Sequence, residues 1–466
     1  MRQDVTPEVC QWRLVVEGVP LRDDYVALIK GLTCYKTIDG ASQLSIDANA
    51  LDPETMEYRI INEAILWPGR KVELFLGYGA SATFPMGRFK IKTHLPKYRP
   101  DGVTVQIEAF DALADMMDEQ ARLIQGAQSH ADVIVDVMER FYPSMGYIVA
   151  QGTKKAGDRF KEAGVTDLAW LKNMAIADGF AYPQVWTREQ YEIARELLRE
   201  RLGDDGLDAL GEVETKVRDD MLVYLPNASV YAFSDVLRLW YDPKGVSDLT
   251  TFDPTFSVQD VPTAVEAYGT VIEGGEPKIK KVVIEFEQGG PRISDVTDEW
   301  ETDWTRDQKI REQIKSGTAV KLYTLGDSTT SYETGQTAQV KNAAGKTATI
   351  RSKRLDREVL NGDGVLIPTT DDLLTFAKRW MLQRASAFLV GEATMSNRIG
   401  SERLAPNQIH EIAGCADPHA GLWALKTVTH QVSGGGHDVT VTTQKLVTEA
   451  DVYGGQDGPK TKVEEA

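Results

Sequence analysis

Two distant stretches of the chain carry the same landmarks in the same order, and this internal repeat constrains the fold more than any other feature. Pro68 opens a turn before a strand-like segment, and Pro406 does the same near the C-terminal end. Residues 87–94 then match 421–430, where both segments end in a histidine after a threonine, and a Val-Thr-Val strand follows each. A repeated hairpin pattern of this length predicts two copies of one folding unit.

Alternation between apolar and polar residues gives both copies their strand character. It runs through 71–78 and again through 102–109, with Pro68-Gly69 as a turn between strands. A period of two places one face of a strand on a core and the other towards solvent or a partner. The sequence therefore predicts a mainly β chain of the α+β class. It would hold two similar antiparallel β-barrels with an α/β segment between them and an insertion in the second barrel.

Helical periodicity replaces the alternation between the two copies. Ser129 and Thr166 are expected to cap two helices, and Thr187 with Gln190 forms a capping-box pattern before a third. The third helix, near 188–202, is strongly charged on one face. We expect a solvated surface helix there. A coiled-coil seam is the alternative, although only about two heptads are present.

These patterns divide the chain into five parts. They are a first β-barrel at 1–115, a helical α/β linking domain at 116–250, a second β-barrel at 251–290 and 366–449, an inserted polar, β-rich segment at 291–365, and a flexible tail at 450–466.

Charge and composition exclude some functions. The formal net charge is −18, from 52 basic and 70 acidic residues, and a surface this acidic repels phosphate. It would suit a surface past which nucleic acid slides, or simply a soluble acidic protein. The sequence begins without a charged-then-apolar leader, no apolar run reaches the roughly 20 residues of a membrane span, and the three cysteines lack paired spacing. We expect an intracellular product with reduced thiols and no membrane insertion.

The residues that bear chemistry do not form a known catalytic or metal-binding motif. His410, Cys415, Asp417 and His419 lie close in sequence, but their spacing matches no zinc motif. The carboxylates between 295 and 303 lack the spacing of a calcium loop. We therefore predict no metal and no cofactor.

Two histidines end matching segments, but neither has a nucleophile motif beside it. His94 and His430 are expected to cap hairpins, with acid–base chemistry as the alternative. We therefore predict no catalytic residue. Trp300 and Trp304 in the insertion are candidates for a protein interface, and packing within the insertion is the alternative.

Four segments carry a resemblance to a known family. They are the run 68–74 with the Asp111-Ala-Leu end, the helix 166–182, the strand 249–269 and the closing hairpin 421–446. In these segments the chain resembles the baseplate hub of contractile phage tails, the late control protein D family. That family is related to the hub part of type VI secretion spike proteins. The resemblance covers most of the chain and implies that the two barrels are similar to tail-tube subunits.

The resemblance also implies an assembly and its partners. It implies a homotrimer in the virion baseplate, built in the host cytoplasm, in contact with tail tube, central spike, tape-measure and baseplate wedge proteins. DNA would pass through the lumen without specific binding. A duplicated barrel would let three chains present six similar units to a six-fold tube. A structural hub is thus expected and not an enzyme. The alternative is a tail-tip protein with cell-wall hydrolase activity, for which the segment 291–365 offers no histidine or cysteine.

Overall fold

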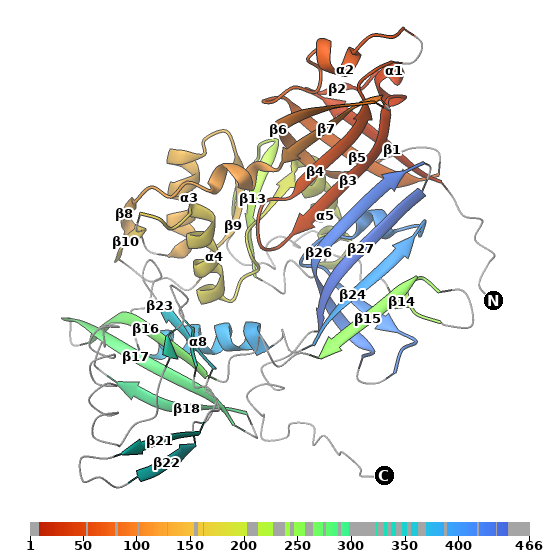
Figure 1. Cartoon of the computed structure of the whole chain (residues 1–466). Helices are drawn as coiled ribbons and strands as arrows, with labels where there is room; N and C mark the ends of the chain where they lie inside the picture. The colour runs from red at the N-terminus through yellow and green to blue at the C-terminus, as the bar shows by residue number, and fades with distance from the viewer. Residues whose placement is uncertain are drawn as a thin grey trace. The chain divides into compact units, whose positions relative to one another are not determined.

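Residues from both ends of the chain build one large sheet in the computed structural model (Figure 1). The chain divides into a first unit, Met1–Thr255 with Leu389–Leu446, and a second unit, Phe256–Phe388 with Val447–Ala466. The structure describes residues 9–52, 55–79, 83–100, 102–127, 129–152, 157–161, 163–202, 213–226, 238–242, 247–256, 264–273, 276–287, 290–297, 323–324, 330–332, 337–341, 347–351, 356–361, 370–385, 389–416, 419–434 and 436–445.

Over the described residues the sheet of the first unit has 13 strands, and most of them fall into two groups with the same chain order and the same neighbours. We call these groups the first copy and the second copy. The first copy comprises β1 (Cys10–Val16), β3 (Ile29–Thr37), β4 (Gln43–Asn49), β5 (Lys71–Tyr78), β6 (Phe84–Arg99) and β7 (Gly102–Phe110). The second copy comprises β14 (Arg238–Trp240), β15 (Thr251–Phe256), β24 (Leu389–Ser396), β25 (Ile409–Ala413), β26 (Gly421–Ser433) and β27 (Gly436–Lys445).

Neighbouring strands follow the order β3-β4-β7-β6-β5-β1 in the first copy and β15-β24-β27-β26-β25-β14 in the second. The copies differ at one end, since β1 pairs antiparallel with β5 while β14 pairs parallel with β25. Short elements complete the two copies, namely β2 (Val19–Pro20), α1 (Asp23–Val26), α2 (Arg59–Asn62) and the 3-10 helix η4 (Ser401–Arg403), while the 3-10 helix η1 (Ala112–Met116) packs into the core of the linking segment. The shared order confirms the predicted fold class, a mainly β chain with two similar antiparallel β units.

A shared irregularity shows which residues of the two copies correspond. The pairing of β6 with β7 shifts at Lys92, and the pairing of β26 with β27 shifts at Lys426. Each shift is a β-bulge, an extra residue on one strand. Counted from the bulges, Gly87 corresponds to Gly421, and both have positive φ angles, 148° and 122°.

The turn before β5 has the same bonds as the turn before β25. Gly69 N donates a hydrogen bond to Ile91 O at 2.7 Å, and Asn407 N donates to Leu425 O at 2.9 Å. Both acceptors directly precede the bulge of their strand. The turns that follow Pro68 and Pro406 are therefore equivalent, as the repeat predicted.

The later landmarks of the predicted repeat are displaced by two residues. Counted from the bulges, His94 corresponds to Val428 and not to His430, and Val105 corresponds to Val439. Both strands also continue beyond their histidine, so neither histidine caps a hairpin. Moving a strand by two residues leaves every side chain on the same face, so the sequence pattern fits both alignments equally well.

Each copy surrounds its own apolar core. In the first copy, strands at opposite ends of the order contribute to one cluster, which includes Leu14 of β1 and Leu32 of β3. The sheet therefore curves around this core, as a barrel does. The core of the second copy includes Leu239, Ala393 and Trp423. The side chains in both cores are almost fully buried.

In the linking segment between the copies, the described residues form two small sheets and three helices. The sheets are β8 (Arg122–Ala127) with β10 (Gly157–Lys161), and β11 (Gln184–Thr187), β13 (Asp220–Tyr224), β9 (Gly146–Ala150) and β12 (Val213–Lys216), in that order. The helices are α3 (His130–Phe141), α4 (Asp167–Asp178) and α5 (Arg188–Leu202).

The predicted helix starts are confirmed. The Ser129 and Thr166 side chains accept hydrogen bonds from backbone N–H groups in the first turns of α3 and α4. At the start of α5, Thr187 N donates to Gln190 Oε1 at 2.9 Å, and Gln190 N donates to Thr187 Oγ1 at 3.3 Å. This is the reciprocal capping box. Tyr191 and Ala194 bury one face of α5, as expected for a surface helix.

The second unit has a sheet of its own. Its strands are β18 (Gly290–Thr297), β17 (Glu276–Glu287), β16 (Ala264–Glu273), β23 (Asp356–Asn361), β20 (Thr330–Tyr332) and β19 (Tyr323–Thr324), and β21 (Thr337–Lys341) pairs with β22 (Thr347–Arg351). Helix α8 (Thr370–Ala385) packs on β16 and β17 and buries Leu373, Phe376 and Ala377.

This arrangement corrects the predicted bounds of the second barrel. Helix α8 lies in the expected segment 366–449, but it belongs to the second unit together with β16 and β17. Residues 264–287 were expected in the second barrel, but β16 and β17 pair with β23 and β18 from the predicted insertion 291–365. Conversely, β14 joins the second copy, although it precedes the expected start at residue 251. An alternating strand can satisfy either sheet, so its pattern does not identify the sheet that it joins.

Candidate assembly site

The two copies meet along a pair of strands, and this pairing makes their sheets continuous. Residues 427–433 of β26 pair antiparallel with residues 31–37 of β3, so that Val432 lies opposite Leu32. Val432 belongs to the core of the first copy although it comes from the second. We call this pairing the internal junction. It fixes the two copies to each other through both backbone bonds and shared apolar burial.

A chain of polar side chains crosses the sheet beside the internal junction. The Tyr78 hydroxyl lies 2.8 Å from His437 Nδ1, His437 Nε2 lies 3.2 Å from His430 Nδ1, and His430 Nε2 lies 3.0 Å from Leu404 O. A carbonyl oxygen can only accept, so we assign the proton of His430 to Nε2. His437 then donates a hydrogen bond from Nε2 to His430 Nδ1, and its Nδ1 accepts a hydrogen bond from the Tyr78 hydroxyl. Each of these side-chain polar atoms has a hydrogen-bond partner when both imidazole rings are neutral.

Burial keeps these histidines neutral. His430 and His437 are almost fully buried. Burial lowers the pKa of His437 to about 4, and burial together with the nearby His437 lowers the pKa of His430 well below its ordinary value. Burial also raises the pKa of the Tyr78 hydroxyl. His94 lies elsewhere, stacked on Trp67 at 5.6 Å between ring centroids. His94 and His430, which end matching segments of the sequence, are therefore not brought together.

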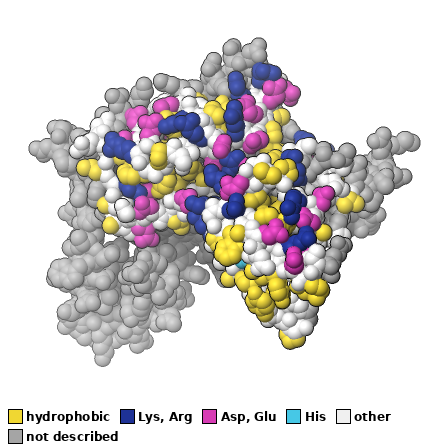
Figure 2. Space-filling view, turned by 90° about the horizontal axis from the view of Figure 1, so that it is seen from above, with side chains coloured by type: hydrophobic (Ala, Val, Ile, Leu, Met, Phe, Trp, Pro, Cys, Tyr) yellow, Lys and Arg dark blue, Asp and Glu magenta, His cyan; other side chains and the backbone are white. Residues whose placement is uncertain are grey.

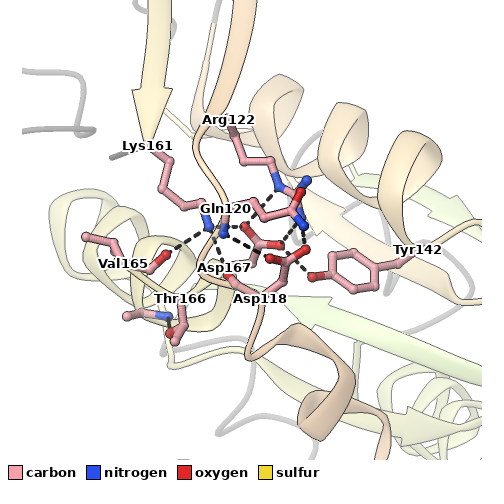
Figure 3. Close-up of polar contacts among 9 residues, drawn as sticks. Asp118, Gln120, Arg122, Tyr142, Lys161, Val165, Thr166 and Asp167 are labelled. Carbon is pink, nitrogen blue, oxygen red and sulfur yellow. Dashed lines mark hydrogen bonds and ion pairs between the residues drawn. The ribbon is translucent and has the colours of Figure 1, made fainter. Parts of the chain in front are cut away.

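A second buried polar cluster holds the linking segment together (Figure 3). The Asp167 carboxylate, 0% exposed, pairs with Lys161 Nζ at 2.7 Å and Arg122 Nη2 at 3.0 Å, and it accepts a hydrogen bond from Tyr142. Arg122 also pairs with Asp118 at 2.6 Å. Two carboxylates thus balance two cations. The hydrogen bond to Asp167 raises the pKa of Arg122, while burial raises that of the Tyr142 hydroxyl.

The position of this cluster indicates a structural role. Lys161 ends β10, Arg122 begins β8 and Asp167 is the first residue of α4, so the cluster ties three element ends together. Lys161 Nζ also donates to Asp118 O at 2.9 Å and to Val165 O at 2.8 Å. Its three N–H groups therefore all have acceptors, which leaves none for a substrate. Sequence reasoning missed the cluster, because its members come from separate elements.

A cavity of about 600 Å³ lies next to the internal junction, between α5 and the loop that contains η4. Ile193 and Leu197 of α5 line one side, and Leu404 and Ala405 line the other. Lys36 of β3 also lines it and is 7% exposed. Burial lowers the pKa of Lys36, and within the described part of the chain no carboxylate forms an ion pair with it.

The remaining candidate residues are dispersed or outside the described residues. His410 lies buried in β25, 3.0 Å from Gln408 Oε1, and Asp417 is not described. Among the residues that are described, no three His, Cys, Asp or Glu side chains form a possible metal site. Trp300 and Trp304 lie outside the described residues. Asp295, in β18, is the one acidic residue between 295 and 303 that lies within the described residues.

Charges on the visible face are mixed. In Figure 2, Lys and Arg side chains lie interspersed with Asp and Glu over the described residues of that face. Among the described residues of that face, the acidic side chains therefore do not form a single patch. No helix in the described ranges is long and apolar enough to cross a membrane.

The fold that these features define is that of phage-type tail proteins. The tail protein from Neisseria meningitidis MC58 aligns over 96% of this chain and 99% of its own, with a TM-score of 0.52 and 10% identity. The 43 kDa tail protein of prophage MuSo2 from Shewanella oneidensis aligns over 95% and 99%, with a TM-score of 0.50 and 10% identity.

A type VI secretion protein aligns less well, and the sequence comparisons found no significant match. The E. coli c3393 protein, a component of the type VI secretion system, aligns over 94% of this chain and 77% of its own, with a TM-score of 0.47 and 8% identity. No protein-family model matches the sequence, and no curated protein sequence matches it significantly. The fold is thus shared with tail proteins at very low sequence identity.

Proposed function

We propose that this protein is a structural hub of a phage contractile-tail baseplate, in which three chains form a ring of six similar units. The observation that carries the proposal is the internal junction, where two copies of one strand arrangement join edge to edge in a continuous sheet. A chain built in this way supplies two adjacent segments of a ring. Three such chains would match a six-fold tube, and closed rotational symmetry is the usual arrangement of protein oligomers.

The shared fold with tail proteins supports the same proposal. In the proposed baseplate the ring joins the tail tube to the central spike, with the tape-measure protein inside and wedge proteins outside. DNA passes through the lumen, and the net charge of −18 would disfavour its binding there. Assembly would take place in the host cytoplasm before the protein becomes part of the virion.

We also propose that the protein is not an enzyme. Its two buried polar clusters are internally satisfied, since the histidines bond to one another and Lys161 has three acceptors. A peptidoglycan zymogram tests the competing hypothesis of a cell-wall hydrolase. No clearing by the purified full chain is expected. Clearing that persists in independent preparations would reject a purely structural function.

The mass of the assembly tests the hub itself. Native mass spectrometry of the purified full chain should give a species of three chains, and cryo-electron microscopy of that species should show a ring with six similar lobes. A stable monomer or dimer at micromolar concentration, alone and with the tube protein, would contradict the proposal.

A further inference from the structure

The internal junction has an unfilled counterpart on the same chain. In the second copy, residues 427–433 of β26 pair with β27 on one side and β3 on the other. The equivalent residues of β6, 93–99, pair with β7 on one side. No described strand pairs with their other edge, because β5 pairs with β6 only up to Lys90, although the rings of Tyr58 and Trp67 contact Tyr98 and His94 of this segment.

Burial at equivalent positions agrees with this difference. In the second copy, where β3 pairs alongside, His430 is 1% exposed and Val432, which packs into the core of the first copy, is 3% exposed. Their counterparts in the first copy are Pro96 and Tyr98, by the same count from the bulges. Pro96 is exposed, and Tyr98 is 67% exposed. The first copy thus presents the surface that the second copy has covered.

Strand β15 is the counterpart of β3 and has an open edge as well. Thr251 Oγ1 lies 2.7 Å from Thr394 Oγ1 of β24, and this side-chain contact places Thr251 beside Thr394, whereas Gly31 of β3 pairs with Asp47 of β4 in the backbone register. Asp47 and Thr394 occupy equivalent positions, because they pair with equivalent residues of β7 and β27. Gly31 and Thr251 therefore correspond. Among the described strands, β15 is the last in the sheet, with no partner on its outer side.

We propose that β15 of one chain lies along residues 93–99 of β6 in the next chain, in the register of the internal junction. This inference rests on the proposed ring and states how one copy of the chain recognises another. Transfer of the register Val432–Leu32 and Gln431–Thr33 places Tyr98 opposite Phe252 of the partner subunit and Lys97 opposite Asp253 of the partner subunit. The occupant of each open edge is thus a second copy of this chain.

The side chains that meet in this register are complementary. Lys97 brings an ammonium opposite a carboxylate, and Tyr98 brings an exposed ring opposite the half-buried ring of Phe252. Opposite charges and aromatic pairs are favourable across antiparallel strands, whereas like charges are unfavourable. A register shifted by one residue would place Lys97 on the other face from Asp253. Complementarity therefore favours the transferred register.

Two prolines make this junction weaker than the internal one. Ile38 N donates a hydrogen bond to Lys426 O at 3.1 Å at one end of the internal junction. In an antiparallel pair of strands, hydrogen-bonded and non-hydrogen-bonded residue pairs alternate. Counted from this bond, His430 and Cys34 form a hydrogen-bonded pair. The transferred register puts Pro96 opposite Pro254 at that position. Neither proline has an N–H group, so two backbone bonds are lost there. The chains can therefore separate while each remains folded.

A cysteine pair in the full chain tests the register. Lys97 and Asp253 would form a pair without backbone bonds, in which the Cα atoms are about 4.5 Å apart, a separation that a disulfide spans. Mild oxidation of the double variant Lys97→Cys with Asp253→Cys should give covalent dimers and trimers on a non-reducing gel. Each single variant should stay monomeric on the gel, as should Lys97→Cys with Pro254→Cys, whose side chains point to opposite faces.

A charge exchange gives a second readout without a crosslink. Lys97→Asp should weaken association roughly tenfold at each junction, and Lys97→Asp with Asp253→Lys should restore it. Native mass spectrometry of the same reduced variants separates the possible failures. A three-chain assembly without a disulfide or charge rescue would overturn this register and leave the hub intact. Absence of any assembly, in the unaltered chain too, would overturn both.

Discussion

Asn407 has the same left-handed backbone conformation as Gly69 at the equivalent turn of its copy, with φ angles of 64° and 94°. Asparagine is among the few residues other than glycine that adopt this conformation at small cost. The Asn407 Nδ2 atom is buried, and no described residue is its hydrogen-bond partner. The residue therefore serves the turn through its backbone and not through its side-chain amide.

Exchange of these two residues should be nearly neutral. Asn407→Gly and Gly69→Asn should change the free energy of unfolding by less than about 0.5 kcal/mol, whereas valine at either position should cost about 1–2 kcal/mol. Urea unfolding followed by circular dichroism measures the difference. Gln431→Val, in the extended strand β26, is the matched control and should have little effect. An equal loss for valine at all three positions would contradict the backbone explanation.

The buried histidines predict a loss of stability in mild acid. Unfolded histidines titrate near pH 6.5, while burial lowers the pKa of His437 to about 4. The unfolded state therefore binds more protons between these values. Stability should be complete above pH 6.5 and fall towards pH 4, by up to about 1.4 kcal/mol per pH unit for each histidine.

His437→Gln isolates this effect, because glutamine can bond to both neighbours but does not titrate. The slope of unfolding free energy against pH should then decrease by about one proton, measured by urea unfolding between pH 4 and 7. His419→Gln, outside the junction, serves as the control. An unchanged slope in His437→Gln would show that other groups cause the acid sensitivity.

Removal of the Asp167 charge should destabilise the linking segment strongly. Asp167→Asn leaves Lys161 and Arg122 buried with one fewer carboxylate, which should cost about 3–5 kcal/mol in urea unfolding. The exposed pair Arg199–Glu196 is the control, and Arg199→Ala should cost at most about 0.5 kcal/mol. Similar losses in both variants would contradict the role of burial.

Replacement of the buried Lys36 by an apolar residue should stabilise the folded protein. Lys36→Met removes a charge that has no ion pair among the described residues, and it should raise the free energy of unfolding by about 1 kcal/mol at pH 7. Burial lowers the pKa of Lys36 in the folded state below the value of 10.5 in the unfolded chain. The loss of folding free energy caused by the buried charge is therefore complete below the folded pKa and disappears as pH rises towards 10.5. The gain from methionine should shrink accordingly in urea unfolding at high pH. A loss of stability at pH 7 would indicate that an anion binds there.

Local signals in the sequence predicted local structure well. Ser129, Thr166 and Thr187 each cap the expected helix, because a cap depends on residues within one turn of it. The repeat was also visible, since Pro68 and Pro406 each precede a turn with fixed geometry. These features need only short stretches of chain to be recognised.

Features that depend on distant residues were not predictable. The sequence could not show that Tyr78 meets His437, or that Asp167 meets Arg122, because the fold alone brings them together. Strand membership failed for a related reason. The alternation in β16 and β17 fits either sheet, and the choice depends on partners elsewhere in the chain.

The place where the second unit leaves the sheet has its own consequence. Strands β15 and β24 are neighbours, and the chain between them contains the strands of the second unit and α8. In the first copy, the equivalent strands β3 and β4 are joined by the short turn 38–42. The inserted segment 257–388 thus stands where the first copy has a hairpin turn, between two neighbouring strands. We expect that such an inserted segment can be exchanged, enlarged or lost during evolution without a change in the strand order of the surrounding sheet.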